Sequence, residues 1–151
     1  MIQQGQCTIF KQNCYSGLEN FASGTPYTYK IALYTAYADL GPSTLAYTTV
    51  NEISGTGYTA GGEDLQNPVL STDGTTAYVT FDDITWNPAS FTARGALVYN
   101  YTTKAACFIL NFGSDKTSSS SFTVQFPAAT STSAILTMGS YTSATVVSSG
   151  D

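Results

Sequence analysis

Histidine is absent from this chain of 151 residues, and the only arginine is Arg94. Charged residues make up 10% of the sequence, whereas about a quarter is typical of soluble proteins. Without an imidazole to activate a serine or a cysteine, the ordinary catalytic triads and dyads are excluded. A net charge of −5 and a pI near 4.3 disfavour the basic face that nucleic-acid binding needs. We therefore expect a protein that is not an enzyme and has no nucleic-acid partner.

Long apolar runs are also missing. No stretch approaches the roughly 20 residues that a membrane-spanning helix requires, so we expect no membrane partner. Residues 1–6, MIQQGQ, lack the charged and apolar regions of a signal peptide. This predicts synthesis in the cytoplasm, and any export would need another route.

Cysteine is scarce, with Cys7, Cys14 and Cys107 as its three copies. An odd number gives no closed disulfide framework, and we interpret these residues as free thiols that pack as small hydrophobic side chains. A zinc site is the alternative, but it would need carboxylate ligands because no histidine is present. We expect no metal and no cofactor.

One α-helix is indicated near the N-terminus, over about residues 8–17. Ile9, Phe10, Cys14 and Leu18 approximate one apolar face. Thr8 is the expected N-cap, and glycine at position 17 is a typical helix terminator.

Short β-strands are indicated through the remainder of the chain. Apolar residues alternate with polar ones, and Gly, Pro, Asn and Asp stand between the segments. A single domain over 1–138 is expected, followed by a tail or arm over 139–151 in which 144–147 could add a strand to a neighbouring sheet. The predicted fold class is all-β, mainly an antiparallel β-sandwich or barrel-like structure with one N-terminal helix. The expected strands are 29–35, 64–71, 75–81, 82–86, 91–101, 105–112, 122–126 and 133–138, with 113–121 as a serine-rich connection.

Few residues are candidates for chemistry. Asp82 and Asp83 are adjacent, so on a strand their side chains point to opposite faces. A capping or turn role is expected, and metal binding or a glycosidase pair stays open.

Arg94 is expected to pair with Asp82 or Asp83, with ligand binding as the alternative. A serine–lysine dyad would need Lys30, Lys104 or Lys116, but no local motif supports one. The glycines of NEISGTGYTAGG, residues 51–62, match no phosphate-binding motif and predict tight turns.

Aromatic residues are the abundant feature, with eleven tyrosines and one tryptophan, Trp86. Tyrosines in strands usually serve the core or a subunit contact. A sugar-binding surface is the alternative, because aromatic rings can stack on sugars.

Three segments carry a resemblance to a known family. They are YKIALYTAYADLGPSTLAYTTVNEISGTGYTAGG, VTFDDITWNPASFTARGALVYN and FGSDKTSSSSFTVQFP, within a stretch of about residues 10–136. Together they resemble small structural proteins of tailed bacteriophage particles, whose members are described as virion or head-associated proteins. The resemblance implies a location and offers no catalytic residues.

From these observations we expect a phage virion structural protein, specifically a capsid decoration (cement) protein. It would be made in the host cytoplasm and bind the outer surface of the phage head, with the major capsid protein and copies of itself as partners. Residues 1–6 and 139–151 are the expected contact arms. The alternative is a tail or fibre component that binds host surface glycans through tyrosines and Trp86.

Overall fold

A five-stranded antiparallel sheet forms the centre of the protein in the computed structural model, which describes residues 1–130 and 132–139. The strand order is β1-β8-β7-β2-β3, and every pairing is antiparallel. β2 and β7 lie in the middle, and most of their side chains are fully buried on both faces of the sheet. The strands are β1 (Gly5–Gln6), β2 (Tyr29–Tyr34), β3 (Glu63–Asp64), β7 (Phe91–Asn100) and β8 (Ala106–Ser118).

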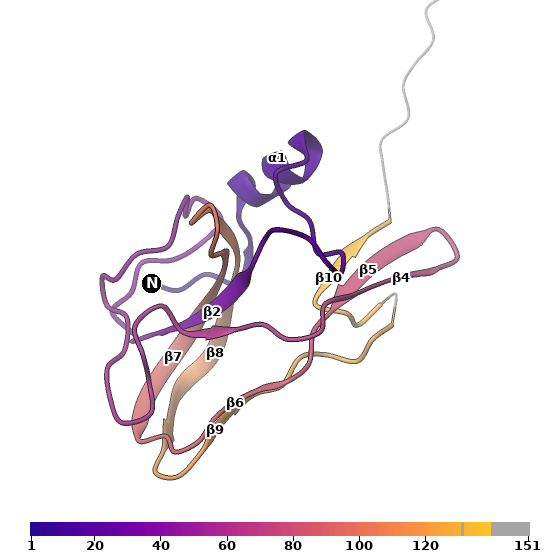
Figure 1. Cartoon of the computed structure of the whole chain (residues 1–151). Coiled ribbons are helices and arrows are strands. Elements are labelled where there is room, and N and C mark those ends of the chain that lie inside the picture. The colour runs from indigo at the N-terminus through magenta and orange to yellow at the C-terminus, as the bar shows by residue number, and fades with distance from the viewer. Residues whose placement is uncertain (131, 140–151) are drawn as a thin grey trace, which may run out of the picture.

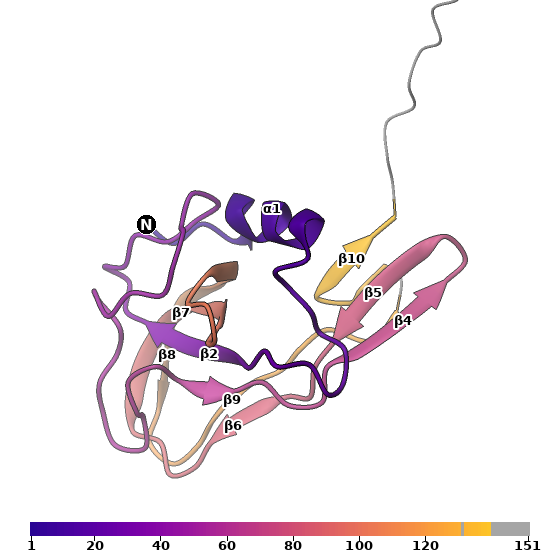
Figure 2. The ribbon, with the colours of Figure 1, turned by 45° about the horizontal axis from the view of Figure 1, so that its top comes forward.

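Two smaller sheets complete the fold. β4 (Val69–Asp73), β5 (Thr76–Thr80) and β10 (Leu136–Met138) form a three-stranded sheet in the order β10-β5-β4. Figures 1 and 2 show this sheet reaching away from the five-stranded sheet. β6 (Ile84–Trp86) and β9 (Phe122–Val124) pair with each other. Their aromatic side chains pack against Phe91 at the start of β7, which makes the arrangement sandwich-like. The prediction of an all-β, mainly antiparallel fold with one N-terminal helix is confirmed.

The helix α1 spans Thr8–Ser16 and packs against β8. Gly17 ends it in the left-handed conformation with φ 78°, as expected. The N-cap prediction is wrong, because Cys7 and not Thr8 holds that position. Cys7 continues the β1–β8 ladder by donating its N–H to the Cys107 carbonyl at 2.9 Å. This bond holds Cys7 in the extended conformation that an N-cap needs, so sheet pairing sets where the helix begins.

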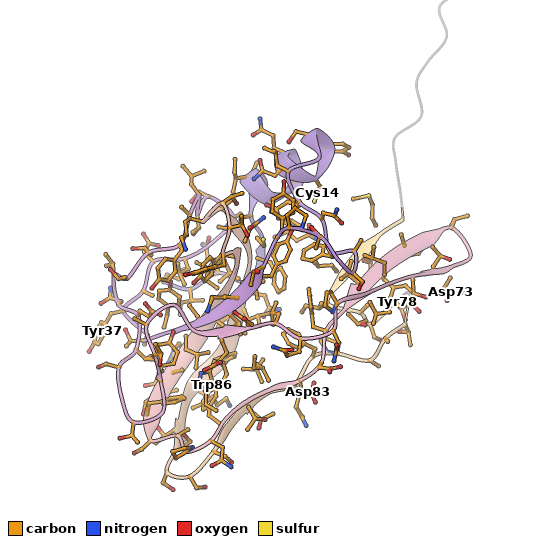
Figure 3. All side chains as sticks on the ribbon, in the orientation of Figure 1. Cys14, Tyr37, Asp73, Tyr78, Asp83 and Trp86 are labelled. Atoms are coloured by element: carbon orange, nitrogen blue, oxygen red, sulfur yellow. The ribbon has the colours of Figure 1, made fainter. Side chains whose placement is uncertain are left out.

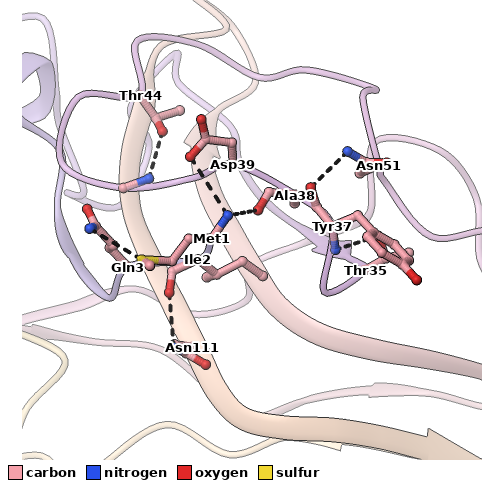
Figure 4. Close-up of polar contacts among 11 residues, drawn as sticks. Met1, Ile2, Gln3, Thr35, Tyr37, Ala38, Asp39, Thr44, Asn51 and Asn111 are labelled. Atoms are coloured by element: carbon pink, nitrogen blue, oxygen red, sulfur yellow. Dashed lines mark hydrogen bonds and ion pairs between the residues drawn. The ribbon is translucent and has the colours of Figure 1, made fainter.

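Residues 1–6, expected as a free contact arm, fold against their own chain instead. Figure 4 shows the Met1 amine donating to the Ala38 carbonyl, at 3.0 Å, and the Asn111 side chain donating to the Ile2 carbonyl, also at 3.0 Å. The Ile2 side chain is buried over Gly95, where an added Cβ would lie 2.8 Å from Ile2 Cδ1. A buried isoleucine and a β-ladder therefore outweigh the freedom of the chain end. The predicted tail lies outside the described residues, apart from Gly139.

β8 is longer than the sequence indicated. The stretch 113–121 was expected to be a connection, but β8 continues to Ser118. The pairing with β7 shifts register between Ala93 and Gly95, so extra residues of β8 bulge outward around Gly113, which has φ 82°. Beyond the bulge the Thr92 and Thr117 hydroxyls bond across the strands at 2.8 Å. A serine- and threonine-rich segment can thus be a strand where a partner ladder holds it.

The glycine-rich stretch 51–62 lies close against the central strands. At Gly62, which has φ 82°, an added Cβ would lie 1.8 Å from the Ile31 carbonyl oxygen of β2. At Gly57, which has φ 88°, it would lie 1.7 Å from the Pro88 carbonyl oxygen. The loop backbone can approach the sheet this closely only where no side chain intervenes. The expectation of tight turns is correct, and the glycines also set the distance between layers.

Gly62→Ala should therefore lower the free energy of unfolding far more than alanine at another glycine in the left-handed conformation. Gly74 is the matched control, because it has φ 60° but no atom within 4 Å of an added Cβ. We expect Gly74→Ala to cost about 1–2 kcal/mol from backbone strain alone. Gly62→Ala should cost on the order of 4 kcal/mol or more, because backbone atoms must also move. Urea denaturation measures both, and equal losses would contradict the close approach.

Candidate functional site

The two adjacent aspartates serve separate structural contacts. The Asn67 side-chain amide donates to Asp82 Oδ2 at 2.5 Å, and the Phe126 N–H donates to Asp83 Oδ1 at 2.9 Å. Each carboxylate thus fixes a different segment next to β6, in line with the expected capping role. The predicted pairing of Arg94 with Asp82 or Asp83 is wrong. Arg94 Nε contacts Asp115 Oδ1 at 3.1 Å, because the bulge of β8 brings Asp115 beside β7.

Two lysines meet on one exposed ring rather than at a serine hydroxyl. Lys104 Nζ lies 3.4 Å from the centre of the Tyr101 ring, and Lys30 Nζ lies 4.7 Å from it. Lys30 also forms an ion pair with Asp64 at 3.1 Å. These contacts tie β2, β3 and the turn after β7 together, and none of them joins Lys30 or Lys104 to a serine.

The three cysteines are free thiols. Burial raises the pKa of Cys14 and Cys107, and both lie near enough to Glu19 for its charge to raise the pKa of each thiol further. Cys7 is the N-cap of α1. Cys7 and Cys107 are buried, and burial raises the pKa of Cys7 to about 11. Cys107 Sγ lies 3.9 Å from Glu19 Oε2. Within residues 1–130 and 132–139, no group of three or more His, Cys, Asp or Glu side chains is arranged to hold a metal ion.

Glu19 is one of two carboxylates that the sequence analysis missed. Its Oε2 accepts from the Tyr29 hydroxyl at 2.7 Å and from the Asn100 amide at 3.3 Å. Its Oε1 is buried, with no partner among the described residues. Burial raises the pKa of Glu19, although these hydrogen bonds oppose the shift. The carboxyl joins the segment after α1 to β2 and β7.

Glu52 is the other missed carboxylate, and it organises a group of tyrosines. Oε1 accepts from the Tyr47 hydroxyl at 2.6 Å, while Oε2 accepts from the Tyr58 hydroxyl at 2.5 Å and from the Gly61 N–H at 2.8 Å. The Tyr58 hydroxyl also accepts from the Leu33 N–H of β2 at 3.0 Å. Burial, with the bond to Glu52 second, raises the pKa of Tyr58. This network, here the Glu52 network, fastens the loop to the sheet.

The sequence held a weak signal for both carboxylates. Glu19 stands in a segment with Leu18 and Phe21, and Glu52 stands close to Tyr47 and Tyr58. A lone carboxylate among apolar and aromatic residues indicates a buried acceptor that needs hydroxyl or amide donors. Which tyrosines supply the donors depends on the fold.

The loop segment before Glu52 carries three large side chains that are exposed. Tyr37, Leu45 and Val50 are 85%, 67% and 67% exposed, and we call these three side chains the loop patch. The loop backbone is held firmly, since the Tyr34 hydroxyl donates to the Thr48 carbonyl at 2.6 Å and Tyr47 N–H donates to the Lys104 carbonyl at 2.9 Å. Figure 3 shows Tyr37 at the outer margin of the molecule. The patch is therefore presented by a fixed backbone.

Trp86 lies inside the protein, in contrast to Tyr37. Its side chain is only 2% exposed and packs edge-on against Phe91 and Phe122, with ring centres 6.4 and 6.0 Å away. A ring enclosed in this way cannot stack on a sugar. The expected contribution of Trp86 to glycan binding is therefore not supported, whereas exposed tyrosines remain available.

An apolar groove of about 590 Å³ runs between α1 and the three-stranded sheet. Phe10, Cys14, Leu70, Val79 and Leu136 contribute to its lining. Few polar groups converge there, so the groove is suited to packing rather than to chemistry.

Comparison with known proteins gave no match among family models, among curated proteins or among solved structures. Across the described part of the chain, no helix has the length and apolar character needed to cross a membrane.

Replacing Tyr58 by phenylalanine should weaken the loop attachment strongly. The change removes a donor to Glu52 and leaves the N–H of Leu33 without its acceptor. We expect a loss of about 2–3 kcal/mol in unfolding free energy, because a buried donor loses its partner. Tyr15→Phe, at an exposed tyrosine of α1, is the matched control and should change stability by less than about 0.5 kcal/mol. Similar effects of the two variants would rule out the network as described.

Glu19→Gln should change how stability depends on pH. The raised pKa means that the folded state holds the Glu19 proton more tightly than the unfolded state. The contribution of the Glu19 proton to the stability of the folded protein is thus complete below about pH 4.3, the pKa of glutamate in the unfolded chain. This contribution is lost as pH rises through the pKa of Glu19 in the folded protein. The stability of Glu19→Gln relative to the natural protein should therefore increase as pH is raised from about 4 to about 8.

Urea denaturation across this pH range gives the difference directly. Glu63→Gln, at an exposed carboxylate of β3, is the control and should not follow the same profile. A flat or falling difference for Glu19→Gln would show that Glu19 is not held in the protonated form by burial.

Proposed function

We propose that this chain is a structural protein of a tailed-phage particle, most specifically a decoration protein that binds and stabilises the assembled head. The observation that carries the proposal is the loop patch. Three large side chains point outward from a loop that the Glu52 network holds rigidly. Apolar side chains presented on a fixed backbone lose little entropy when a partner covers them.

The composition supports the same function. The chain has few charges, five cations and ten acids, so its surface relies on hydroxyl and amide groups. The resemblance of the three quoted segments to tailed-phage virion proteins supports a location in the phage particle. The partners under this proposal are the major capsid protein and further copies of this chain on the outside of the head.

A contact of this size is sufficient because the capsid is repetitive. One patch of three side chains gives a weak contact, but many copies that bridge neighbouring capsid subunits strengthen the shell together. No enzymatic step is required, and the described contacts of Lys30, Asp82, Asp83 and Arg94 are those of structural ties.

A second candidate is a tail or fibre component that binds host glycans. The exposed ring of Tyr37 favours it, because an accessible tyrosine can stack on a sugar and also donate a hydrogen bond. The buried Trp86 contributes nothing to this function.

The copy number in purified particles distinguishes these candidates. Quantitative mass spectrometry should find on the order of hundreds of copies per particle for a decoration protein, as multivalent coverage requires. A handful of copies, together with glycan binding that Tyr37→Ala abolishes, would instead place it in the tail. Absence from purified particles would refute both functions.

Binding to isolated heads tests the loop patch itself. Val50→Asp should reduce occupancy at least about tenfold, because a charge would be buried in the contact. Tyr15→Asp, which places the same charge on exposed α1, should bind as the natural protein does. Equal binding by both variants would exclude the loop patch as the contact.

A further inference from the structure

β4 is an open edge of the three-stranded sheet. It pairs with β5 on one side, and the order β10-β5-β4 leaves its other side without a neighbour among the described residues. Val69 and Leu70 are 52% and 54% exposed. Natural edge strands are usually protected by lysines, bulges or a covering segment. β4, with the sequence VLSTD, contains no lysine or arginine, and its pairing with β5 has no bulge.

The hairpin geometry identifies the backbone groups on the open side. β4 and β5 are joined by the two-residue loop 74–75, and Asp73 lies opposite Thr76. The residues that flank such a loop exchange hydrogen bonds, and this alternates along the ladder. Asp73 and every second residue before it are thus bonded to β5. Leu70 and Thr72 direct their N–H and C=O groups outward, where no described residue bonds to them.

The open ladder has a defined length and centre. Pro68 lies directly before β4 and, two residues before Leu70, also faces the open side. Proline has no N–H to donate there. At the other end the chain turns at Gly74, which has φ 60°. The ladder available to a new strand is therefore Val69–Asp73, with Ser71 at its centre.

We propose that β4 is a self-association site, at which β4 of a second copy pairs antiparallel about a two-fold axis through Ser71. In this register Leu70 exchanges both backbone hydrogen bonds with Thr72 of the partner subunit, and the symmetry repeats the pair. The neighbouring registers that keep outward groups face to face differ by a shift of two residues. A shift toward the start of β4 places Thr72 opposite Pro68, which has no N–H. A shift toward its end places Leu70 opposite Gly74 in the turn. The centred register satisfies the most outward groups, as buried backbone groups require.

The side chains are compatible with this pairing. Val69 lies opposite Asp73 of the partner subunit, so the two aspartates do not face each other. Leu70 is also in a cross-strand row with Val79 and Leu136. The Leu70 side chains of the two copies become diagonal neighbours on that face. The second copy thus extends an apolar row that already crosses the sheet.

The strength of this contact follows from its size. Pairing of two short edges buries less than the roughly 1,000 Å² of a stable interface. Self-association should therefore be weak in dilute solution and effective where copies are concentrated on a common support. The pairing does not rest on the proposed capsid function, since it follows from β4 alone.

A cysteine at the two-fold axis tests the pairing directly. In the centred register the two Ser71 residues form a non-hydrogen-bonded pair with Cα atoms about 4.5 Å apart, within the range that a disulfide spans. Glutathione disulfide, itself reduced to two thiols, should oxidise two Ser71→Cys chains to a covalent dimer. Dimer formation should be at least about tenfold faster than in the wild-type protein, whose three thiols control for background.

Val69→Cys is the matched control for the register. It lies on the same strand, but its counterpart in the second copy would be four positions, or about 13 Å, further along. It should therefore form no more dimer than the wild-type protein. Equal cross-linking of Ser71→Cys and Val69→Cys, or none by either, would overturn the proposal.

Reversible association provides a second test without new thiols. Sedimentation velocity of the wild-type protein up to about 1 mM should show a dimer, and Leu70→Lys should weaken it at least about tenfold. Tyr15→Lys, at an exposed residue of α1, should associate like the wild type. A wild-type protein that remains monomeric at this concentration would overturn the proposal. The proposal would also be overturned if the Ser71→Cys variant, in particles, formed its disulfide with a different protein. Neither result alters the copy number that tests the proposed function.

Discussion

Burial of the central β2–β7 pair on both faces is the constraint on which the rest of the structure depends. A strand pair with no exposed face needs a cover on each side. The loop over 35–62 supplies part of this cover. Its backbone bonds to β2 at Ile53, whose N–H donates to the Leu33 carbonyl at 3.0 Å, and it lies close against Ile31 at Gly62, where no side chain intervenes. The glycine at position 62 is therefore required by the strand it approaches, and the glycine at position 57 by the connection between β6 and β7 at Pro88. The Glu52 network then fastens the polar end of the same loop.

Tyrosine hydroxyls replace cations as the partners of the half-buried carboxylates Glu19 and Glu52. With only five lysines and arginines, the chain has few ammonium or guanidinium groups to place inside. Both oxygens of Glu52 accept hydrogen bonds, from Tyr47, Tyr58 and a backbone N–H, and one oxygen of Glu19 accepts from Tyr29 and Asn100. Burying these neutral donors costs less desolvation free energy than burying the charged amine of a lysine would. The many tyrosines therefore serve internal attachment as well as the surface.

The fold class and the helix could be predicted from the sequence because they depend on local patterns. Alternation marked β2 and β7, and Gly17 marked the end of α1. The Arg94 partner, the length of β8 and the packing of residues 1–6 could not be predicted, since each depends on a register between distant strands. Asp115 reaches Arg94 only because of the bulge between Ala93 and Gly95. The carboxylate at 19 was missed for the same reason, because its donors lie on β2 and β7. The carboxylate at 52 was missed because the fold of its own loop decides which nearby tyrosines reach it.

The scarcity of ion pairs has a consequence for the environments in which the fold can persist. In the part of the chain that the structure describes, the ion pairs involve the Met1 amine with Asp39, Lys30 with Asp64 and Arg94 with Asp115, all with partly exposed side chains. Dissolved salt screens such exposed pairs, but it affects less the short bonds between half-buried hydroxyl and carboxylate groups. We therefore expect the stability of this fold to depend little on ionic strength.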